Sequence, residues 1–265
     1  MYLIFTDLDG ALLDHGTYSW EAARPALDRL KSQQIPWILA TSKTRGEVEL
    51  WRRVLGNEHP FIVENGGAAF LPTGYLPEPV RGVEQRGAYE VLEWGTPYNE
   101  LVASLERASH SSRCRVRGFH EMTPEEVSRL CELPLEQAVL AKQREYDEPF
   151  LIVDPERTDA LIATIEGQGR RCTRGGRFWH ILGANDKAHA VKALSALFEE
   201  AFGPVVTIGL GDGLNDTLFL NSVTAPILIR SSHSEELQAR VPRGLLTDRP
   251  GPAGWNDALL RIIPA

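Results

Sequence analysis

Short apolar runs alternate with amphipathic stretches over the first third of the chain. Residues 2–6 are apolar without polar alternation, as expected for a central parallel strand covered on both faces. A helical pattern follows at 20–33, with Leu27 and Leu30 on one face and charged residues on the other. The two patterns then recur as a strand at 35–41, a helix at 44–55 and a strand at 61–63. This alternation predicts an α/β fold built on a doubly wound parallel sheet.

The pattern changes after residue 72, where a stretch rich in Pro and Gly leads out of the predicted sheet. Strands are then predicted at 89–93, 115–119 and 150–153, separated by helices at 99–108, 124–132 and 155–166. Strands with helices packed on one face indicate an α+β unit. The first pattern resumes with a helix at 187–201, a strand at 205–209, a helix after residue 215 and a strand at 225–230. The sequence therefore predicts a core of residues 1–84 and 182–265, split by an inserted α+β domain at 85–181.

Composition and charge exclude several classes of protein. The chain has 265 residues, 43% of them hydrophobic and 24% charged, which is typical of one or two folded domains. With 28 basic and 36 acidic residues, the formal net charge of −8 argues against nucleic acid or an anionic membrane as a partner. The three cysteines lack the spacing of a disulfide framework or a zinc site. The first apolar run meets Asp7 too early for a signal peptide, and no apolar stretch is long enough to span a membrane, so we expect a cytoplasmic protein.

Two acidic segments follow buried strands of the predicted core. They are Asp-Leu-Asp-Gly at 7–10 and Gly-Asp-Gly-Leu-Asn-Asp at 211–216. The carboxyl ends of strands line the ligand crevice in open α/β sheets, so we expect Asp7, Asp212 and Asp216 at one edge of the sheet. Carboxylates gathered there repel one another unless a cation binds between them. Because the ligands are oxygens, with no cysteine or histidine cluster, the predicted ion is Mg²⁺ rather than zinc.

An anionic ligand at this edge would also need positive charge and hydrogen-bond donors. Thr41 and Ser42 come at the end of the second strand, and Lys187 begins the helix that precedes the strand leading to Asp212. A hydroxyl and an ammonium group can hold phosphoryl oxygens and spread the charge that develops during phosphoryl transfer. Taken singly, Thr41 reads as a helix cap and Lys187 as a solvated helix residue. The ordered set of four elements instead predicts a phosphoryl-transfer site.

This ordered set resembles the haloacid dehalogenase superfamily of phosphohydrolases. The matching elements are D-x-D-G at 7–10, Thr41, Lys187 and G-D-x-x-N-D at 211–216. The resemblance implies that Asp7 is the nucleophile, which forms an aspartyl-phosphate, and that Asp9 is the general acid and base. It also implies that Asp7, Asp212 and the main-chain carbonyl of Asp9 hold Mg²⁺, with Asp216 in support. Ala11 departs from the pattern, since phosphatases of the superfamily usually carry Thr there, and a hydroxyl that braces Asp9 is missing.

Further segments resemble the mannosyl-3-phosphoglycerate phosphatase family, so that the resemblance covers nearly the whole chain. These segments lie at 42–45, 64–67, 144–150, 175–180 and 250–255. The resemblance implies hydrolysis of 2-O-mannosyl-3-phosphoglycerate, a small phosphorylated glycosyl-glycerate, to the compatible solute mannosylglycerate. The candidate substrate contacts are Arg144 and Arg177 for the carboxylate, Glu145 and His180 for the sugar hydroxyls, Lys43 and Arg45 at the mouth of the crevice, and Gly10, Ser42, Asn65 and Asn215 beside the phosphate or the substrate.

Other functions share parts of this pattern. A phosphatase of glucosyl-3-phosphoglycerate, of sucrose phosphate or of a broader range of sugar phosphates would keep every core residue, because specificity lies in the insert. A phosphomutase of the same fold would retain a phosphorylated intermediate instead of releasing phosphate. From a different class, a non-catalytic sugar-phosphate sensor would have little need for nucleophile, acid/base and metal ligands together. A receiver-like signalling domain is phosphorylated after its third strand, where this chain has Glu64 and Asn65.

Overall fold

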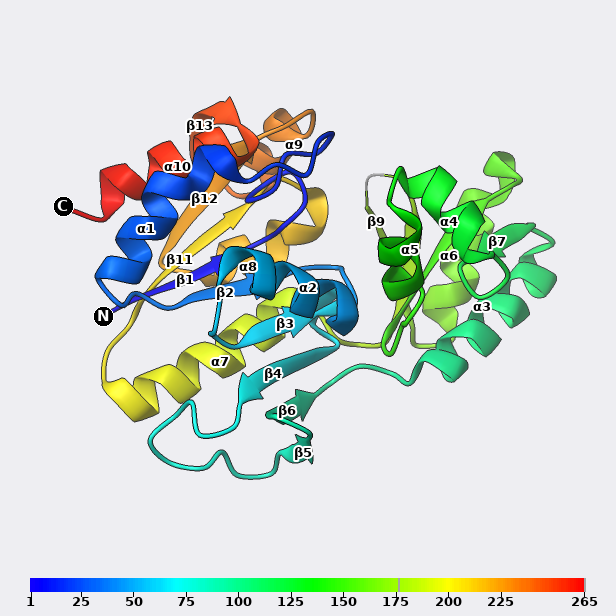
Figure 1. Ribbon diagram of the computed structural model, residues 1–265. Coiled ribbons are helices and arrows are strands. Elements are labelled where there is room, and N and C mark those ends of the chain that lie inside the picture. Colours follow the sequence, from blue (N-terminus) through cyan, green and yellow to red (C-terminus); the bar gives the residue numbers. More distant parts are fainter. Residues whose placement is uncertain (176, 265) are drawn as a thin grey trace.

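A computed structural model of the chain describes residues 1–175 and 177–264. The two outer stretches of the sequence meet in one sheet of nine strands, in the order β13-β12-β11-β1-β2-β3-β4-β6-β5 (Figure 1). These strands are β1 (Tyr2–Thr6), β2 (Trp37–Ala40), β3 (Phe61–Val63), β4 (Ala68–Pro72), β5 (Glu84–Arg86), β6 (Tyr89–Glu93), β11 (Val206–Gly211), β12 (Ala225–Arg230) and β13 (Leu245–Pro250). The strands from β13 to β3 are parallel and the edge formed by β4, β6 and β5 is antiparallel. The predicted doubly wound parallel sheet is confirmed.

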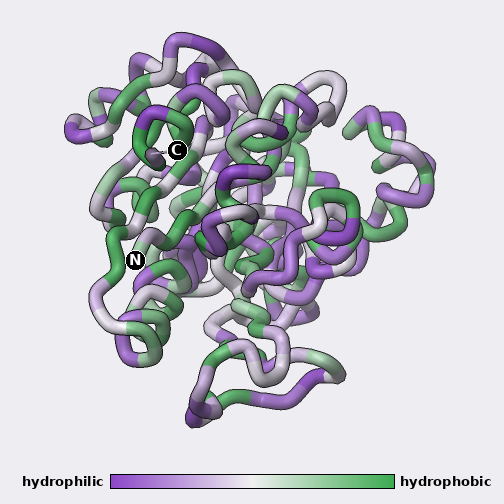
Figure 2. The backbone as a smooth tube through the Cα atoms, turned by 60° about the vertical axis from the view of Figure 1, so that its left-hand side comes forward, coloured by the Kyte–Doolittle hydropathy of each residue, from purple (hydrophilic) through white to green (hydrophobic). Residues whose placement is uncertain are grey.

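Helices cover both faces of this sheet. They are η1 (Glu21–Ala23), α1 (Arg24–Ser32), α2 (Arg45–Leu55), η2 (Glu64–Gly66), α7 (Lys187–Phe202), η4 (Leu214–Asp216), α8 (Thr217–Ser222), α9 (Ser234–Arg240) and α10 (Gly251–Ile262). Ile4 of β1 belongs to the same apolar cluster as Leu27 of α1 and Trp255 of α10, whereas Leu3 and Phe5 face the cluster of α7 and α8. Successive strand residues point to opposite faces, which explains why the first apolar run contains no polar position. Figure 2 shows hydrophobic and hydrophilic residues alternating along the surrounding helices.

Helix α2 begins where its sequence predicts. The hydroxyl of Thr44 accepts the backbone N–H of Glu47, and the Glu47 carboxylate accepts the backbone N–H of Thr44. This reciprocal pair satisfies two donors that the start of a helix leaves free. At the other end Gly56 adopts a φ of +60°, in the left-handed conformation that ends many helices. The capped helix start fixes the loop at 41–43 that follows β2.

The chain changes its direction of travel across the sheet at β1. It first proceeds from β1 to β2 and β3, and after the insert it returns to β11, on the other side of β1. In open α/β sheets ligands bind at such a switch point, outside the carboxyl ends of the strands. The loops that follow β1 and β11 hold Asp7 and Asp212, so both acidic segments lie at the position where this fold binds ligands.

The insert forms a second, antiparallel sheet in the order β7-β8-β10-β9. Its elements are α3 (Tyr98–Ser112), β7 (Val116–Gly118), α4 (Pro124–Cys131), α5 (Leu135–Ala141), β8 (Asp147–Ile152), η3 (Pro155–Arg157), α6 (Thr158–Gly167), β9 (Arg171–Arg174) and β10 (Trp179–Leu182). Helices α3 and α6 pack on Phe150 through Leu101 and Leu161. Helices α4 and α5 instead pack around Phe178 and against Leu151, which points to the opposite face from Phe150. The expectation that all helices lie on one face is therefore wrong.

The pairing of β5 and β6 does not support the prediction that the insert begins at residue 85. Strand β6 pairs with β4 in the nine-stranded sheet, with Val91 opposite Phe70, and β5 extends the same edge. The sequence analysis predicted no strand at the position of β4. Without β4 as a pairing partner, the strand predicted at 89–93 was assigned to the insert. We propose that the insert begins after Glu93 and ends near Leu182, where β10 ends.

Candidate active site

The two acidic loops meet at the carboxyl ends of β1 and β11. The backbone N–H of Asp7 donates to the carbonyl of Leu210 at 2.9 Å, which continues the pairing of the two strands beyond β1. One carboxylate oxygen each from Asp7, Asp212 and Asp216 lie within 4.8 Å of one another. Gly10 has a φ of +76°, and a Cβ there would lie 2.3 Å from Oδ2 of Asp212. Only glycine fits this close approach, so the loop sequence itself brings the two acidic segments together.

Lys187 lies inside this acidic cluster. Its Nζ is 3.0 Å from Oδ1 of Asp7 and 2.6 Å from Oδ1 of Asp216, and its side chain is almost completely buried. The side chain of Asp186 caps the start of α7 by accepting the N–H of His189, which holds Lys187 at the first helical position. Burial by itself would lower the pKa of Lys187, but the carboxylates of Asp216 and Asp7 outweigh it and raise the pKa. The ammonium is therefore held charged beside Asp7.

The cluster keeps an excess of negative charge. Three carboxylates and one ammonium sum to −2 when all are ionised. Burial raises the pKa of Asp7 to about 6, with Lys187 acting in the opposite direction and Asp216 in the same direction. Burial, Asp216 and Asp7 also raise the pKa of Asp212 well above its ordinary value. The protein alone does not neutralise these carboxylates.

The hydrogen bonds of the cluster separate two kinds of carboxylate. Asp216 is saturated, since Oδ1 accepts from Lys187 and Oδ2 accepts the N–H groups of Asp212 and Gly213 at 3.2 and 3.1 Å. In contrast, Oδ2 of Asp7 and both side-chain oxygens of Asp212 accept no hydrogen bond from the residues described. An oxygen-only donor set with free oxygens and two excess negative charges fits a hard divalent cation such as Mg²⁺.

Asp9 is held by a second buried lysine. Nζ of Lys43 lies 2.9 Å from Oδ2 of Asp9 and 3.5 Å from Oε1 of Glu47, and it also lies 5.4 Å from the centre of the Tyr18 ring. Burial alone would lower the pKa of Lys43, but Asp9 and Glu47 outweigh it and raise the pKa. Lys43 was expected at the mouth of the crevice, and the structure instead buries it against Asp9. An ammonium thus contacts Asp9, although Ala11 supplies no hydroxyl.

The loop after β2 brings Thr41 and Ser42 to the same edge. Oγ1 of Thr41 accepts the N–H of Lys43 at 3.2 Å, and the carbonyl of Thr41 accepts the N–H of Asn65 at 3.0 Å. Arg45 is the first residue of α2 and pairs with Glu49, one turn further along the helix. Arg45 is thereby directed along its own helix.

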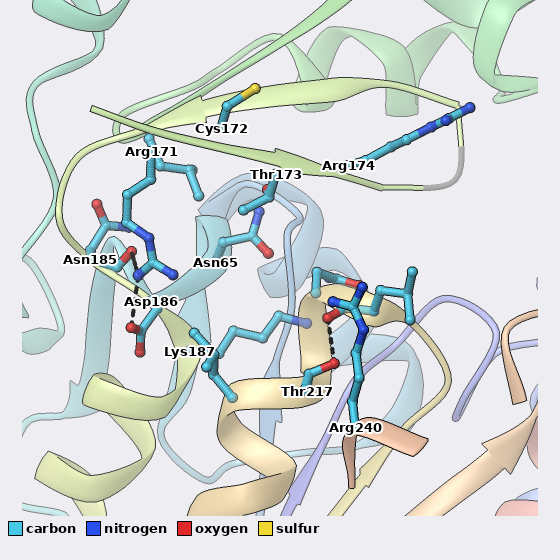
Figure 3. A pocket seen from close by; sticks show the side chains of 14 residues that line it. Asn65, Arg171, Cys172, Thr173, Arg174, Asn185, Asp186, Lys187, Thr217 and Arg240 are labelled. Carbon is cyan, nitrogen blue, oxygen red and sulfur yellow. Dashed lines mark hydrogen bonds and ion pairs between the residues drawn. The ribbon is translucent and has the colours of Figure 1, made fainter. Parts of the chain in front are cut away.

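A cavity of about 380 Å³ opens beside Lys187, between the core and strand β9 of the insert. Figure 3 shows Asn65 and Lys187 reaching it from the core, with Thr173 of β9 on the opposite side. Asn215 and Thr217 also line it. The structure thus brings Asn65, Lys187 and Asn215 to one cavity.

The four predicted substrate contacts of the insert do not line this cavity, His180 among them. Arg144 is half-buried and donates to the carbonyl of Ser42 at 2.8 Å, and the carboxylate of Glu145 lies 3.5 Å from Arg86. Arg177 is half-exposed and pairs with Glu132 and the carbonyl of Leu130. Each of these charges already has partners nearby. Gly176, in the segment at 175–180 that carries part of the family resemblance, lies outside the described residues.

Two buried carboxylates that the sequence analysis did not single out join the insert to the core. Glu64 accepts the N–H groups of Glu145 and Tyr146, at 3.0 and 2.8 Å, and burial raises the pKa of Glu64 to about 8 against the opposing effect of Arg144. Asp147 accepts from Asn65 and from His180, each at 2.8 Å. The sequence signal that could have indicated Asp147 is the acidic pair Asp147 and Glu148, which precedes the strand predicted at 150–153. Strand β8 begins three residues earlier and buries both of its acidic residues.

Comparison with known sequences places the chain among phosphatases. A family model for haloacid dehalogenase-like hydrolase matches residues 4–109. A glucosyl-3-phosphoglycerate/mannosyl-3-phosphoglycerate phosphatase from Methanococcoides burtonii is 43% identical, over 99% of this chain and 97% of its own. A mannosyl-3-phosphoglycerate phosphatase from Pyrococcus furiosus is 34% identical, over 89% of this chain and 94% of its own.

Solved structures share the whole architecture at low sequence identity. A protein from Thermoplasma acidophilum matches with a TM-score of 0.69 at 18% identity, covering 98% of this chain and 97% of that chain. A sucrose-phosphatase from Synechocystis, in complex with sucrose and phosphate, matches with a TM-score of 0.64 at 13% identity, covering 98% and 97%. These matches support the fold alone. No helix among the described residues is long and apolar enough to cross a membrane.

Proposed function

The chain belongs to the mannosyl-3-phosphoglycerate phosphatase family of the haloacid dehalogenase superfamily, and from that premise we propose that it hydrolyses glycosyl-3-phosphoglycerates with Mg²⁺. The observation that carries the proposal is the cluster of Asp7, Lys187, Asp212 and Asp216 in a chain that aligns almost end to end with such phosphatases. The products are a glycosylglycerate and inorganic phosphate. The mannosyl ester is the first substrate we propose.

Asp7 is the nucleophile in this proposal. Its free oxygen Oδ2 attacks the phosphorus, the bond between phosphorus and the glycerate oxygen breaks, and an aspartyl-phosphate remains. Lys187 holds the other oxygen of Asp7 at 3.0 Å, which fixes the direction of attack and opposes the charge on the phosphoryl oxygens. Thr41 and Ser42 lie at the same edge of the sheet, where a hydroxyl and backbone N–H groups hold those oxygens.

Asp9 moves the proton. It donates a proton to the departing glycerate oxygen, then takes one from the water that attacks the aspartyl-phosphate. Its Oδ1 is buried and accepts no hydrogen bond from a described residue, while Oδ2 is held by Lys43. Lys43 therefore orients the carboxyl group with one oxygen left for proton transfer.

Asp7, Asp212 and the main-chain carbonyl of Asp9 would hold Mg²⁺, and Asp216 would support the site through the backbone N–H groups it binds. When bound, the ion supplies the positive charge that lets an anionic phosphate approach these carboxylates. The three cysteines are free thiols, which is consistent with a reducing compartment such as the cytoplasm.

The substrate is a small anion with sugar hydroxyls. The cavity is lined by four cationic side chains and one anionic one, in a chain whose formal net charge is −8. Its cationic residues are Arg171, Arg174, Lys187 and Arg240. A glucosyl substrate is the second candidate, since the relatives from Methanococcoides burtonii and Persephonella marina carry both sugars in their names.

Phosphate release from a panel of esters tests this proposal. The panel contains mannosyl- and glucosyl-3-phosphoglycerate, sucrose phosphate, hexose phosphates and p-nitrophenyl phosphate, each with Mg²⁺ and with excess chelator. We expect the highest kcat/KM for a glycosyl-3-phosphoglycerate and no release in chelator. A hexose phosphate as best substrate would contradict the substrate assignment, and full release in chelator with no metal bound would contradict the role of Mg²⁺.

A further inference from the structure

Asn65 presents the two ends of its amide to different surroundings. Its Nδ2 donates to Oδ2 of Asp147 at 2.8 Å. Its Oδ1 is buried and has no hydrogen-bond partner among the described residues. Figure 3 shows this side chain beside the cavity that Lys187 and Thr173 also line. A buried amide oxygen without a donor is costly unless a ligand supplies one.

Asp147 fixes which end of the amide faces the cavity. Asp147 is fully buried, and its other oxygen lies 2.8 Å from Nδ1 of His180. A carboxylate only accepts hydrogen bonds, so it selects the NH₂ end of Asn65 and turns the carbonyl oxygen away toward the cavity. The orientation of the amide is therefore set by a residue of the insert.

The backbone around Asn65 is held in an uncommon conformation. Glu64, Asn65 and Gly66 have φ values of +46°, +55° and +87° in succession. Left-handed conformations are costly for residues with a side chain and persist where surrounding contacts enforce them. Gly66 enforces a close approach, since a Cβ there would lie 2.2 Å from the carbonyl oxygen of Asp186. This approach holds Asn65 beside the start of α7 and Lys187.

The chemistry of the amide oxygen identifies its ligand. An oxygen that only accepts would repel the oxygens of a phosphate or carboxylate, and it attracts a hydroxyl donor. In a glycosyl-3-phosphoglycerate both glycerate hydroxyls are already substituted, so the donor must be a hydroxyl of the sugar. The cavity also offers the hydroxyls of Thr173 and Thr217 and the amide of Asn215, and its volume of about 380 Å³ lies in the range of small-molecule sites.

We propose that this cavity is the sugar subsite, in which Oδ1 of Asn65 accepts a hydrogen bond from one sugar hydroxyl and Asp147 is the positioning residue that orients the Asn65 amide. The assignment rests on the proposed function, because it takes the leaving group to be a glycosylglycerate. Asn65 then selects for the sugar, and this selection depends on contact between insert and core. Asp147 acts only through Asn65 and His180.

A set of substrates that each lack one sugar hydroxyl tests the subsite. For the wild-type enzyme we expect one of these deoxy substrates to lose roughly tenfold in kcat/KM relative to the parent. Asn65→Gly removes the amide and tolerates the positive φ, so it should reduce kcat/KM for the parent to the level of that deoxy substrate. The variant should treat the parent and this deoxy substrate equally, with the loss for the parent appearing chiefly as a higher KM.

Asp147→Asn tests the positioning role. Its amide oxygen would face Nδ1 of His180, leaving its NH₂ group toward Asn65, which must then turn its own oxygen away from the cavity. The variant should lose discrimination against the same deoxy substrate, chiefly through KM for the parent. Glu148→Gln is the matched control, because Glu148 is an equally buried neighbour that faces Tyr98 and His120 instead. Glu148→Gln should keep the wild-type ratio of kcat/KM for the parent to kcat/KM for the deoxy substrate.

The outcomes separate this inference from the proposed function. If the wild-type enzyme hydrolyses no glycosyl-3-phosphoglycerate, the proposed function fails. If it does so but no deoxy substrate is discriminated, or if Asn65→Gly keeps the discrimination, the subsite is wrong while the function stands. If Asp147→Asn and Glu148→Gln lower every rate equally and keep the wild-type ratio, Asp147 is a structural residue only.

Discussion

The core and the insert use buried carboxylates differently. In the core, Asp7 and Asp212 keep side-chain oxygens that accept nothing from the described residues, and Lys187 neutralises the cluster only in part. At the contact of insert and core, Glu64 and Asp147 receive donors on both oxygens. Carboxylates with unsatisfied oxygens suit the binding of a cation, whereas carboxyl groups that receive donors on both oxygens fix geometry. The comparison supports our proposals that the core performs the chemistry and that the insert orients the substrate.

The largest expected effect is on the chemistry of the core. Asp7→Asn removes the nucleophilic carboxylate, and we expect phosphate release to fall by at least about 10³-fold. Asp14→Asn is a matched control in the same loop, since Asp14 accepts hydrogen bonds only from neighbouring Thr17 and Gly16 and should keep activity within about twofold. Residual activity of Asp7→Asn near the wild-type level, in folded protein judged by circular dichroism, would assign the nucleophile elsewhere.

The next largest effect is expected when the lysine is removed from the core cluster. Lys187→Met leaves its carboxylates without their buried counter-charge, and we expect the free energy of unfolding to fall by about 3 kcal/mol in chelator. Mg²⁺ should restore part of this loss, because the carboxylates would regain a cation. Urea unfolding measures both effects, with the exposed Lys192→Met on the same helix expected to stay within about 0.5 kcal/mol of wild type. Equal stability of the two variants would contradict the account of the cluster.

The buried carboxyl group of Glu64 should make the free energy of unfolding depend on pH. Its pKa in the folded protein is about 8, above its ordinary value of 4.5, so the folded state keeps a proton that the unfolded state releases. The contribution of this retained proton to the free energy of unfolding is complete below about pH 4.5 and is lost as pH rises to about 8. The free energy of unfolding should fall by at most about 1.4 kcal/mol per pH unit in this window. Glu64→Gln should flatten the pH dependence of urea unfolding in this window. An unchanged slope would show that Glu64 is ionised throughout.

The smallest expected effect is at Arg177. Its ion pair with Glu132 is half-exposed, so Arg177→Ala should change the free energy of unfolding by less than about 1 kcal/mol. Because Arg177 does not line the cavity, kcat/KM for a glycosyl-3-phosphoglycerate should stay within about threefold of wild type. A large loss of kcat/KM for this substrate, with p-nitrophenyl phosphate unaffected, would show that Arg177 contacts the substrate carboxylate, as the sequence predicts.

The sequence predicted the core site because its residues follow strand ends directly. Asp7, Thr41 and Asp212 each come at the end of a buried strand, so the order of strands alone brings them to one edge. The contacts of Arg144 and Arg177 depend instead on how separate elements pack, which local periodicity does not encode. Their charge and motif suggested substrate contacts, but nearby acceptors already occupy them.

The missed elements have a similar explanation. Helix α10 packs on α1, more than 200 residues earlier in the chain, where Asn256 accepts the N–H of Ala26. Strand β8 begins earlier than its apolar residues because Asp147 and Glu148 are buried with partners from other segments. An acidic residue in a strand is usually exposed, so its burial became visible only with its partners in place. The sequence named Asn65 of the proposed sugar subsite as a substrate contact, but it did not indicate Asp147, the buried residue that orients the Asn65 amide.

The most direct test of the central claim looks for phosphate bound covalently to Asp7. Enzyme in excess would be mixed with a glycosyl-3-phosphoglycerate and quenched in acid, and mass spectrometry would examine the peptide containing Asp7. In a single turnover, trapping by acid should recover phosphate bound to the Asp7 peptide. Phosphate released at full rate with no phosphorylated Asp7 peptide at any time, including in Asp9→Asn, would contradict the claim and indicate direct attack by water.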